Sequence, residues 1–279
     1  DEVALRYYKT VVERFPKTKA SKEALSFVEI IYNNQGKPQD YFDYVKEIPG
    51  ASVSINLQDS TIYQNAMNFY TEENFIRASK ELDNYIKRFG DDGFFIIAAN
   101  YYKAECDFYT GDKIQALNHY DYVAKQSTNP YQEKSIIKLT NHYFKEKQYP
   151  EALDYYRRLE PIAASKSTYL NAILGQMRCY DALSDFSQAK AKAIQLLPIE
   201  NVPKEDLVEA NMTLGRIQLA QTNLRTAKSH FDYVIAESRN ELTAEALYQR
   251  AYIRYTYNEL EDSRNDIYKL NEDFSAYEF

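Results

Sequence analysis

The sequence predicts an all-α protein in which about seven to eight helix pairs stack into a right-handed α-α superhelix. The first observation behind this prediction is a pattern of small and apolar residues that recurs every 36 to 38 residues along the 279-residue chain. The second is composition. Only 7 Gly and 8 Pro are present, too few for long flexible linkers or for an all-β fold with many glycine turns.

The second helix of each predicted pair opens with a small residue, and apolar side chains follow four and seven positions later. In the clearest set these residues are Ala227, Phe231 and Val234. Their spacing places all three on one helix face. The eight sets open at Ala4, Tyr41, Ala78, Ala116, Ala152, Ala189, Ala227 and Ser263.

The first helix of each pair is predicted from the residue twelve positions before the opener. Most of these residues are small, as the close approach of two packed helices requires. From the third set onward they are Ala66, Ala104, Thr140, Met177, Gly215 and Ala251.

This pattern resembles the tetratricopeptide repeat (TPR), which places a small residue within its first helix and Ala, aromatic and aliphatic residues in its second. The match is best at Leu214-Gly215 with Ala227 and Phe231. The period of about 37 is longer than the family standard of about 34, and no Trp is present. The resemblance implies a TPR-like solenoid that binds proteins.

The helix junctions suggest a narrower resemblance. Arg14-Phe15-Pro16, followed by Ser21 and Ala24-Leu25, resembles junctions in bacterial cell-envelope TPR proteins. These include outer-membrane assembly lipoproteins and the factor that coordinates the Tol–Pal system. The resemblance implies an envelope-associated adaptor, and we favour a periplasmic or outer-membrane-associated location over a cytoplasmic one.

Three regions are expected. Residues 1–48 form N-terminal TPR-like helices with an incomplete first pair, residues 49–58 an irregular connection, and residues 59–279 a regular array truncated at its C-terminus. The connection is expected to be an ordered loop on the edge of the array, with a hinge as the alternative. Asp59-Ser60 is expected to cap the helix that follows. Since the sequence opens inside a repeat, we expect a fragment of a longer array, with any signal peptide or lipid anchor upstream.

Charge and hydropathy exclude two kinds of partner. The formal net charge is −7, and Lys and Arg form no cluster, so nucleic acid is not an expected partner. The longest fully apolar run is Phe94–Ala99, far too short to span a bilayer. We therefore expect no direct membrane insertion.

The reactive side chains follow the repeat rather than forming a single site. Cys106 and Cys179 share one repeat position, and His119 and His230 share another. Recurrence at a fixed position is typical of packing, and two cysteines two repeats apart are too distant for a disulfide. No phosphate loop, nucleophile motif or zinc spacing is present. We expect no catalytic residue, no metal and no cofactor, and therefore no enzyme.

The remaining candidate is the concave groove that first helices line in a solenoid. Tyrosines there would supply a large contact area at low entropic cost, although packing on a neighbouring helix is the alternative for each ring. The predicted ligand is a peptide or a segment of a protein partner. The predicted groove residues are Tyr63, Met67, Tyr70, Tyr101, Glu105, Phe108, Tyr109, Asn141, Phe144, Arg178, Met212, Arg216, Tyr248, Tyr252 and Tyr255.

Function is therefore predicted as a non-catalytic protein-interaction scaffold. Two alternatives stay open: a self-assembling structural element whose array ends stack, and an accessory domain of a larger enzyme or signalling protein.

Overall fold

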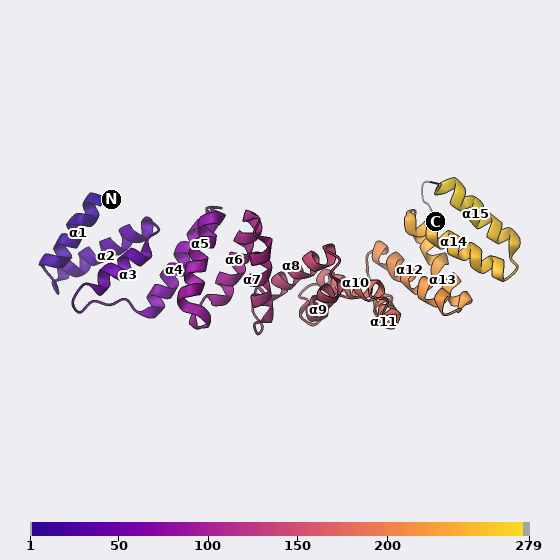
Figure 1. The fold of residues 1–279 in the computed structure, drawn as a ribbon, viewed down its shortest axis with the longest axis horizontal. Helices are drawn as coiled ribbons and strands as arrows, with labels where there is room; N and C mark the ends of the chain where they lie inside the picture. The colour runs from indigo at the N-terminus through magenta and orange to yellow at the C-terminus, as the bar shows by residue number, and fades with distance from the viewer. Residues whose placement is uncertain (1, 276–279) are drawn as a thin grey trace. The chain divides into compact units, whose positions relative to one another are not determined.

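The structure, a computed structural model that describes residues 2–275, consists of α-helices joined by short connections (Figure 1). The described residues contain no β-strand. The helices are α1 (Glu2–Arg14), α2 (Lys19–Asn34), α3 (Pro38–Lys46), α4 (Ile55–Thr71), α5 (Phe75–Phe89), α6 (Ile96–Thr110), α7 (Lys113–Lys125), α8 (Gln132–Lys145), α9 (Tyr149–Leu159), α10 (Lys166–Ala182), α11 (Phe186–Leu196), α12 (Lys204–Ala220), α13 (Leu224–Glu237), α14 (Glu241–Thr256) and α15 (Leu260–Asp273), with 3₁₀ turns η1 (Gly90–Asp92) and η2 (Glu160–Ile162).

The predicted all-α array of helix pairs is confirmed. Each even-numbered helix from α4 to α14 is a first helix, and the odd-numbered helix after it is its partner. Contacts join α4 to α5, α6 to α7, α10 to α11, α12 to α13 and α14 to α15. Every predicted opener lies in an odd-numbered helix. Five of them are completely buried, namely Ala78, Ala116, Ala152, Ala189 and Ala227.

Glycine marks two points where an aromatic ring lies directly against a helix backbone. A Cβ added to Gly215 of α12 would lie 2.5 Å from a ring carbon of Phe231 in α13. A Cβ on Gly175 of α10 would lie 2.4 Å from the ring of Tyr156 in α9. Real Cβ atoms do not approach so closely, so both positions require glycine for packing rather than for backbone freedom.

The two helices of each pair are joined by the same turn. One residue adopts a positive φ, and the next backbone N–H donates to the carbonyl oxygen five residues earlier, as Asp112 does to Asp107 at 2.8 Å. This is a Schellman-type helix end. The positive-φ residues of these turns within helix pairs are Gly36, Glu73, Gly111, Lys147, Ser184, Thr222 and Asn258.

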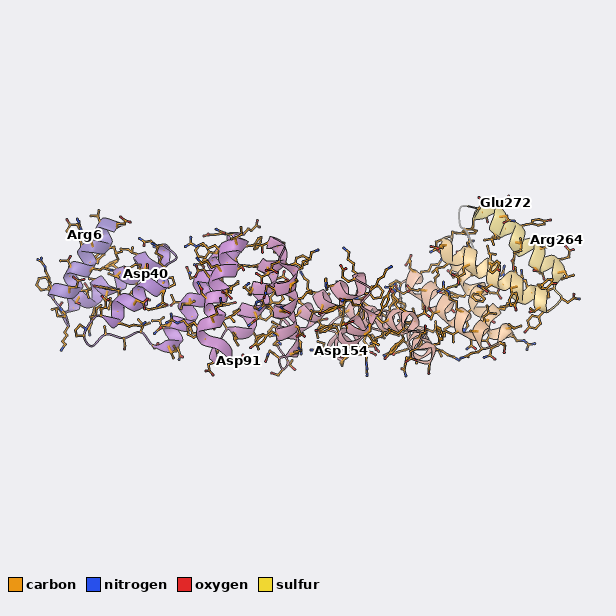
Figure 2. All side chains as sticks on the ribbon, in the orientation of Figure 1. Arg6, Asp40, Asp91, Asp154, Arg264 and Glu272 are labelled. Atoms are coloured by element: carbon orange, nitrogen blue, oxygen red, sulfur yellow. The ribbon has the colours of Figure 1, made fainter. Side chains whose placement is uncertain are left out.

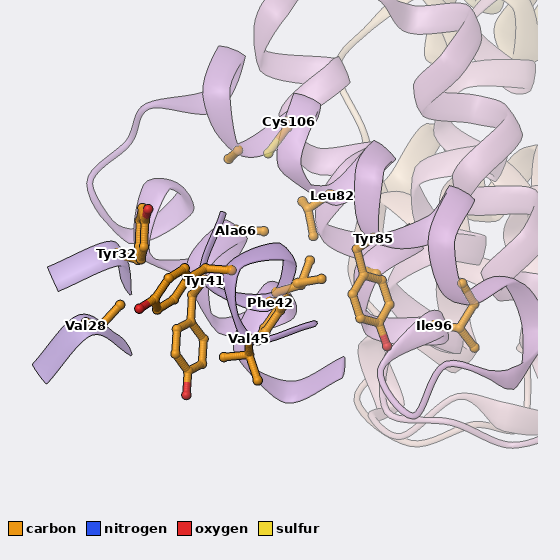
Figure 3. Packing of buried hydrophobic residues seen from close by; sticks show 14 of the residues in the cluster. Val28, Tyr32, Tyr41, Phe42, Val45, Ala66, Leu82, Tyr85, Ile96 and Cys106 are labelled. Carbon is orange, nitrogen blue, oxygen red and sulfur yellow. The ribbon is translucent and has the colours of Figure 1, made fainter. Parts of the chain in front are cut away.

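The chain folds as two compact units, residues 1–135 and residues 136–279, called unit 1 and unit 2 below. In unit 1, Tyr41 and Phe42 of α3 and Leu82 and Tyr85 of α5 belong to one buried cluster (Figure 3). In unit 2, Phe231 and Leu247 lie in a cluster formed by α12 to α15, and another forms around Ile173 and Leu196.

The irregular connection is shorter than the predicted 49–58. Helix α3 ends at Lys46 and α4 begins at Ile55, where the Ser54 hydroxyl accepts a hydrogen bond from the Leu57 N–H at 3.2 Å. Ala51 and Val53 pack against the core of unit 1, as an ordered loop does. The division between the compact units falls instead within α8.

The capping role predicted for Asp59-Ser60 is wrong. Asp59 lies inside α4 and is buried, 6% exposed. Its carboxylate accepts hydrogen bonds from the Tyr85 hydroxyl at 2.7 Å and from the Phe94 N–H at 2.8 Å. Asp59 therefore connects α4 to α5 and to the start of the next pair. An Asp next to a Ser is compatible with a helix cap and with a buried residue inside a helix. Only the packing shows that Asp59 is the buried residue.

Candidate functional site

The predicted groove tyrosines of unit 1 stack on other rings. Tyr63 in α4 lies parallel to Phe95 with ring centroids 4.4 Å apart, and Tyr109 in α6 stacks on Phe75 at 4.5 Å. Tyr70 meets the edge of Tyr102 at 4.8 Å. In α4 and α6 these rings hold neighbouring helices together. Of them, Tyr109 stays largely exposed, as does Phe108.

Three predicted groove residues are buried, so the expectation that they line an exposed surface does not hold in this structure. Tyr101 is 9% exposed and stacks on Tyr131. Glu105 is 8% exposed and accepts a hydrogen bond from the Tyr120 hydroxyl. Met212 is fully buried in the core that α12 shares with α13 and α14. The physical reason is that first helices are packed on three sides, which leaves only a narrow exposed strip.

Three other predicted groove residues differ in their exposure. Met67 of α4 is half-buried, and so is Phe144 of α8, whose ring meets the edges of Tyr149 and Tyr156. Asn141 is exposed.

In unit 2 the first helix α14 presents an exposed aromatic row. Tyr248, Tyr252 and Tyr255 of α14 are 47%, 53% and 67% exposed. Their spacing of four and three residues puts the three rings on one face of the helix. We call these three residues the tyrosine row.

Beside the row, first helices α10, α12 and α14 are linked by two equivalent ion pairs. Arg178 of α10 holds Glu209 of α12 in a two-pronged contact of 2.6 and 2.5 Å. One repeat later, Arg216 holds Glu245 of α14 in the same way, with Nε 2.7 Å from Oε1. The two glutamates were not predicted, although they stand 36 residues apart at one repeat position. We call the four residues the Arg–Glu ladder.

The Arg–Glu ladder has two carboxylates beside it, Asp181 and Asp206. Burial raises the pKa of Asp181; Arg216 opposes this, and Glu209 and Glu245 add to it. Burial likewise raises the pKa of Asp206; Arg178 opposes this, and Glu209 adds to it. Neither forms an ion pair among residues 2–275, since both arginines are engaged by the glutamates. The surface therefore has more negative than positive groups.

A cavity opens at the α10 end of the ladder. It has a volume of about 520 Å³ and is bordered by Leu170, Leu174 and Arg178 from α10 and by Pro203 and Asp206 at the start of α12. Lys166 and Arg178 bring positive charge to the border of this cavity, and Asp206 brings negative charge. We define the α10–α12–α14 face as the Arg–Glu ladder, Asp181, Asp206 and the tyrosine row.

The reactive side chains behave as the repeat predicts. Cys106 and Cys179 are free and buried, and burial raises the pKa of each thiol to about 12. Such thiols are poor nucleophiles. His119 and His230 each place Nδ1 against an asparagine Oδ1, at 2.7 Å from Asn100 and 2.8 Å from Asn211.

Other kinds of site find no support in the described residues. Residues 2–275 hold no group of three or more His, Cys, Asp or Glu side chains placed to bind a metal ion. No helix there has the length and apolar composition that crossing a membrane requires. Charged side chains are spread along the helices, as the exposed, labelled Arg6, Asp40, Asp91, Asp154, Arg264 and Glu272 illustrate (Figure 2).

The fold, but no family, is established by comparison with known proteins. No protein-family model and no curated protein matches the chain. Among solved structures it is similar to the C-terminal part of a TPR repeat-containing protein from Cytophaga hutchinsonii, with 13% identity and a TM-score of 0.54 over 98% of this chain and 96% of that one. This similarity shows the fold of TPR proteins.

Two further solved structures are similar at lower TM-scores. PilW, a type IV pilus biogenesis factor, is 17% identical with a TM-score of 0.45 over 79% of this chain and 95% of that one. The quorum sensor NprR from B. thuringiensis is 13% identical with a TM-score of 0.46 over 99% of this chain and 77% of that one.

Proposed function

We propose that this chain, which has the fold of TPR proteins, is a non-catalytic scaffold that binds a segment of a protein partner on the α10–α12–α14 face. The observation that carries the proposal is the tyrosine row, three rings between 47% and 67% exposed on one helix face. Aromatic rings exposed side by side are typical of interaction surfaces. Tyrosine suits this role because its ring supplies contact area while its hydroxyl stays hydrated.

The charges beside the row favour a basic segment. Glu245 lies three and seven residues before Tyr248 and Tyr252, which puts it on their side of α14. Asp181 interacts electrostatically with Arg216 and Glu245, but it forms no ion pair with another of the described residues. A Lys or Arg from the partner would pair with Asp181, and its aliphatic stem or charged end would lie on a tyrosine ring. We therefore propose a partner segment with basic residues between apolar anchors.

The test is affinity capture from envelope and soluble fractions of the native cell. The variant carries Tyr248→Ala, Tyr252→Ala and Tyr255→Ala, and a matched control carries Tyr7→Ala and Tyr268→Ala, exposed tyrosines on α1 and α15. We expect a protein that the native chain and the control retain and the triple variant loses. Its binding should weaken in high salt and with Asp181→Asn. Equal capture by all three would rule out the row as the binding surface.

Self-assembly is a second candidate function, and the repeat position of Tyr248 in the tyrosine row favours it. Tyr248 holds the repeat position of Tyr63 and Tyr101, which stack on Phe95 and Tyr131, rings that precede the next first helix. The row thus matches a surface on which another repeat pair packs elsewhere in this chain. Light scattering that rises with concentration, and that the triple variant abolishes, would favour self-assembly over a separate partner.

The envelope location is proposed from the junction sequence around Arg14–Pro16 alone. The same capture experiment tests it, because the fraction that yields the partner reports the compartment.

A further inference from the structure

An exposed apolar surface of unit 1 lies at the edge where the ends of three helices meet. Helices α5, α6 and α7 lie side by side (Figure 1), and α6 contacts both of the others. Helix α5 begins at Phe75, α6 ends at Thr110 and α7 begins at Lys113. Because helices joined by short connections run antiparallel, these three ends lie at the same edge of unit 1.

Each of the three helix ends presents one large exposed side chain. Ile76 of α5, Tyr109 of α6 and Ile114 of α7 are 78%, 61% and 73% exposed. Tyr109 also stacks on Phe75, the residue before Ile76, with ring centroids 4.5 Å apart. This contact fixes the tyrosine ring next to the start of α5. We call Ile76, Tyr109 and Ile114 the turn-edge patch.

Packing within the chain does not explain the two isoleucines. Ile76 and Ile114 each lie two residues before a fully buried alanine, Ala78 and Ala116. They therefore hold the same repeat position on the two helices that flank α6. Two residues along a helix turn a side chain by about 200°, so this position points away from the buried side. Large apolar residues exposed next to one another mark interaction surfaces.

The charges beside the turn-edge patch differ between its two sides. Glu72 and Glu73 lie in the turn before α5, and Lys113 is the first residue of α7; all three are exposed. None of the three forms an ion pair with another of residues 2–275. Asp112, next to Lys113, caps α7 and accepts a hydrogen bond from the Gln115 N–H at 3.2 Å. The patch thus has unpaired acids on its α5 side and an unpaired lysine on its α7 side.

Two basic residues of α5 do not cancel the acids at this edge. Arg77 lies over the ring of Phe69 in α4, 3.9 Å from the ring centroid, and is turned toward α4. Lys80 lies one turn further along α5, beyond the helix start that carries the patch. Acids on one side and a base on the other make the edge complementary to itself rather than to a partner with charges of one sign.

We propose that the turn-edge patch is the contact between two copies of this chain. A two-fold axis through Tyr109 exchanges the α5 side of one copy with the α7 side of the other. Ile76 then lies against Ile114 of the second copy, and Lys113 lies near Glu73 of the second copy; both contacts occur twice. Since three side chains per copy are far fewer than a standard interface contains, the dimer should be weak, with a dissociation constant on the order of 100 μM. The contact shares no residue with the α10–α12–α14 face.

The test is sedimentation equilibrium over a range of chain concentrations, with two single variants. Ile114→Glu brings a negative charge near Glu73 of the second copy, and Ile76→Lys brings a positive charge near Lys113 of the second copy. The dissociation constant of each variant alone should rise about tenfold or more. An equal mixture of the two should associate again, because the introduced charges attract each other in the mixed dimer and its other contact keeps both native isoleucines. This recovery requires the two-fold contact between these positions.

A matched control is Ile194→Glu, at an exposed isoleucine of α11. It should leave association unchanged, as should the triple tyrosine variant. Because every substituted isoleucine is exposed, melting temperatures should stay within about 2 °C of the native value.

Three results would overturn the proposal for the turn-edge patch. The native chain could be monomeric at every concentration, which would leave this edge to a different protein. Either single variant could associate as tightly as the native chain, or the mixture could fail to recover. Loss of association in the triple tyrosine variant would also overturn it, because the association would then belong to the tyrosine row. The two proposals therefore fail separately.

Discussion

Units 1 and 2 place the same residue types at first-helix positions and use them differently. In unit 1, Tyr63 and Tyr101 stack on rings that precede the next first helix. In unit 2, Tyr248 holds the same repeat position but is 47% exposed. A tyrosine at one fixed position thus either stabilises the array or is available to a partner. The difference lies in whether a second ring stands opposite, which depends on residues roughly 30 positions away in the chain rather than on the tyrosine itself.

Charged residues show a parallel contrast. In α6 of unit 1, Lys103 and Asp107 form an ion pair whose side chains are 10% and 4% exposed, and Ser79 donates a further hydrogen bond to Asp107. In unit 2, the side chains of Arg178 and Glu209 are 36% and 28% exposed. The buried pair fixes one packing of α5 against α6, whereas the exposed pair is screened by solvent. Four predictions, each with a matched variant, compare the two units further.

Lys103→Met should produce the largest effect. It leaves the buried Asp107 carboxylate without its counter-charge, which should lower the free energy of unfolding by about 3–5 kcal/mol. Arg178→Met, the matched change in unit 2, should lower it by about 1 kcal/mol or less. Urea denaturation followed by circular dichroism measures both. Equal losses of stability would show that the buried Lys103–Asp107 pair contributes no more to stability than the exposed Arg178–Glu209 pair.

Gly215→Leu tests the close ring contacts that unit 2 makes at glycine. The new side chain would displace Phe231, so we expect a loss of about 1–3 kcal/mol or more. The control Ala220→Leu adds the same side chain at an exposed position of the same helix and should change stability by about 0.5 kcal/mol at most. Thermal melts compare the two. Equal melting temperatures would contradict the packing described for α12 and α13.

Thr222→Gly tests the turn that both units share. Thr222 has φ of 60°, a conformation that is unfavourable for a β-branched residue. Glycine adopts it freely, so the free energy of unfolding should rise by about 1 kcal/mol. Gly111→Ala, at φ of 91°, should change stability in the opposite direction. Urea midpoints that move the same way for both variants would contradict the common turn.

The smallest expected effect is a pH dependence common to both units. Burial lowers the pKa of His119, with Lys103 adding to the effect, and burial lowers that of His230, with Lys190 adding to it. The unfolded chain therefore binds protons that the folded chain excludes. The stabilising contribution of the neutral rings is complete above the ordinary pKa of 6.5 and is lost as the pH falls below it.

The matched variant for this pH effect carries His119→Gln and His230→Gln, which keep a hydrogen-bonding group beside each asparagine. Urea midpoints measured above and below pH 6.5 should differ less for this variant than for the native chain. An unchanged difference would assign the pH dependence to the carboxylates instead.

Periodicity predicts the fold well because burial recurs with it. Ala66, Ala104 and Ala251 are each 3% exposed or less, since every first helix must approach its partner in the same way. The close contact at Gly175 was not predicted because the ring that it meets, Tyr156, comes from the preceding helix pair. The repeat pattern used for prediction relates only residues within one pair. The helix start expected after Asp59 was wrong for a related reason: the partners of Asp59 lie 26 and 35 residues away.

The candidate site was less predictable. Register alone separates a first helix into faces, but it does not say which face a neighbour covers. Met212 and Tyr252 were both assigned to the groove; the core of unit 2 encloses the first, and the second is exposed.

The common turn also has a mechanical consequence. Its positive-φ residues follow one another at intervals of 36 to 38 residues, so a pulling force meets links of nearly equal length. One link of about 37 residues would release about 120–130 Å of chain on extension. Neighbour-to-neighbour packing lets such links detach one after another. A chain pulled at two points would therefore unfold in steps of nearly equal length, and it would refold in the same steps when the force is released.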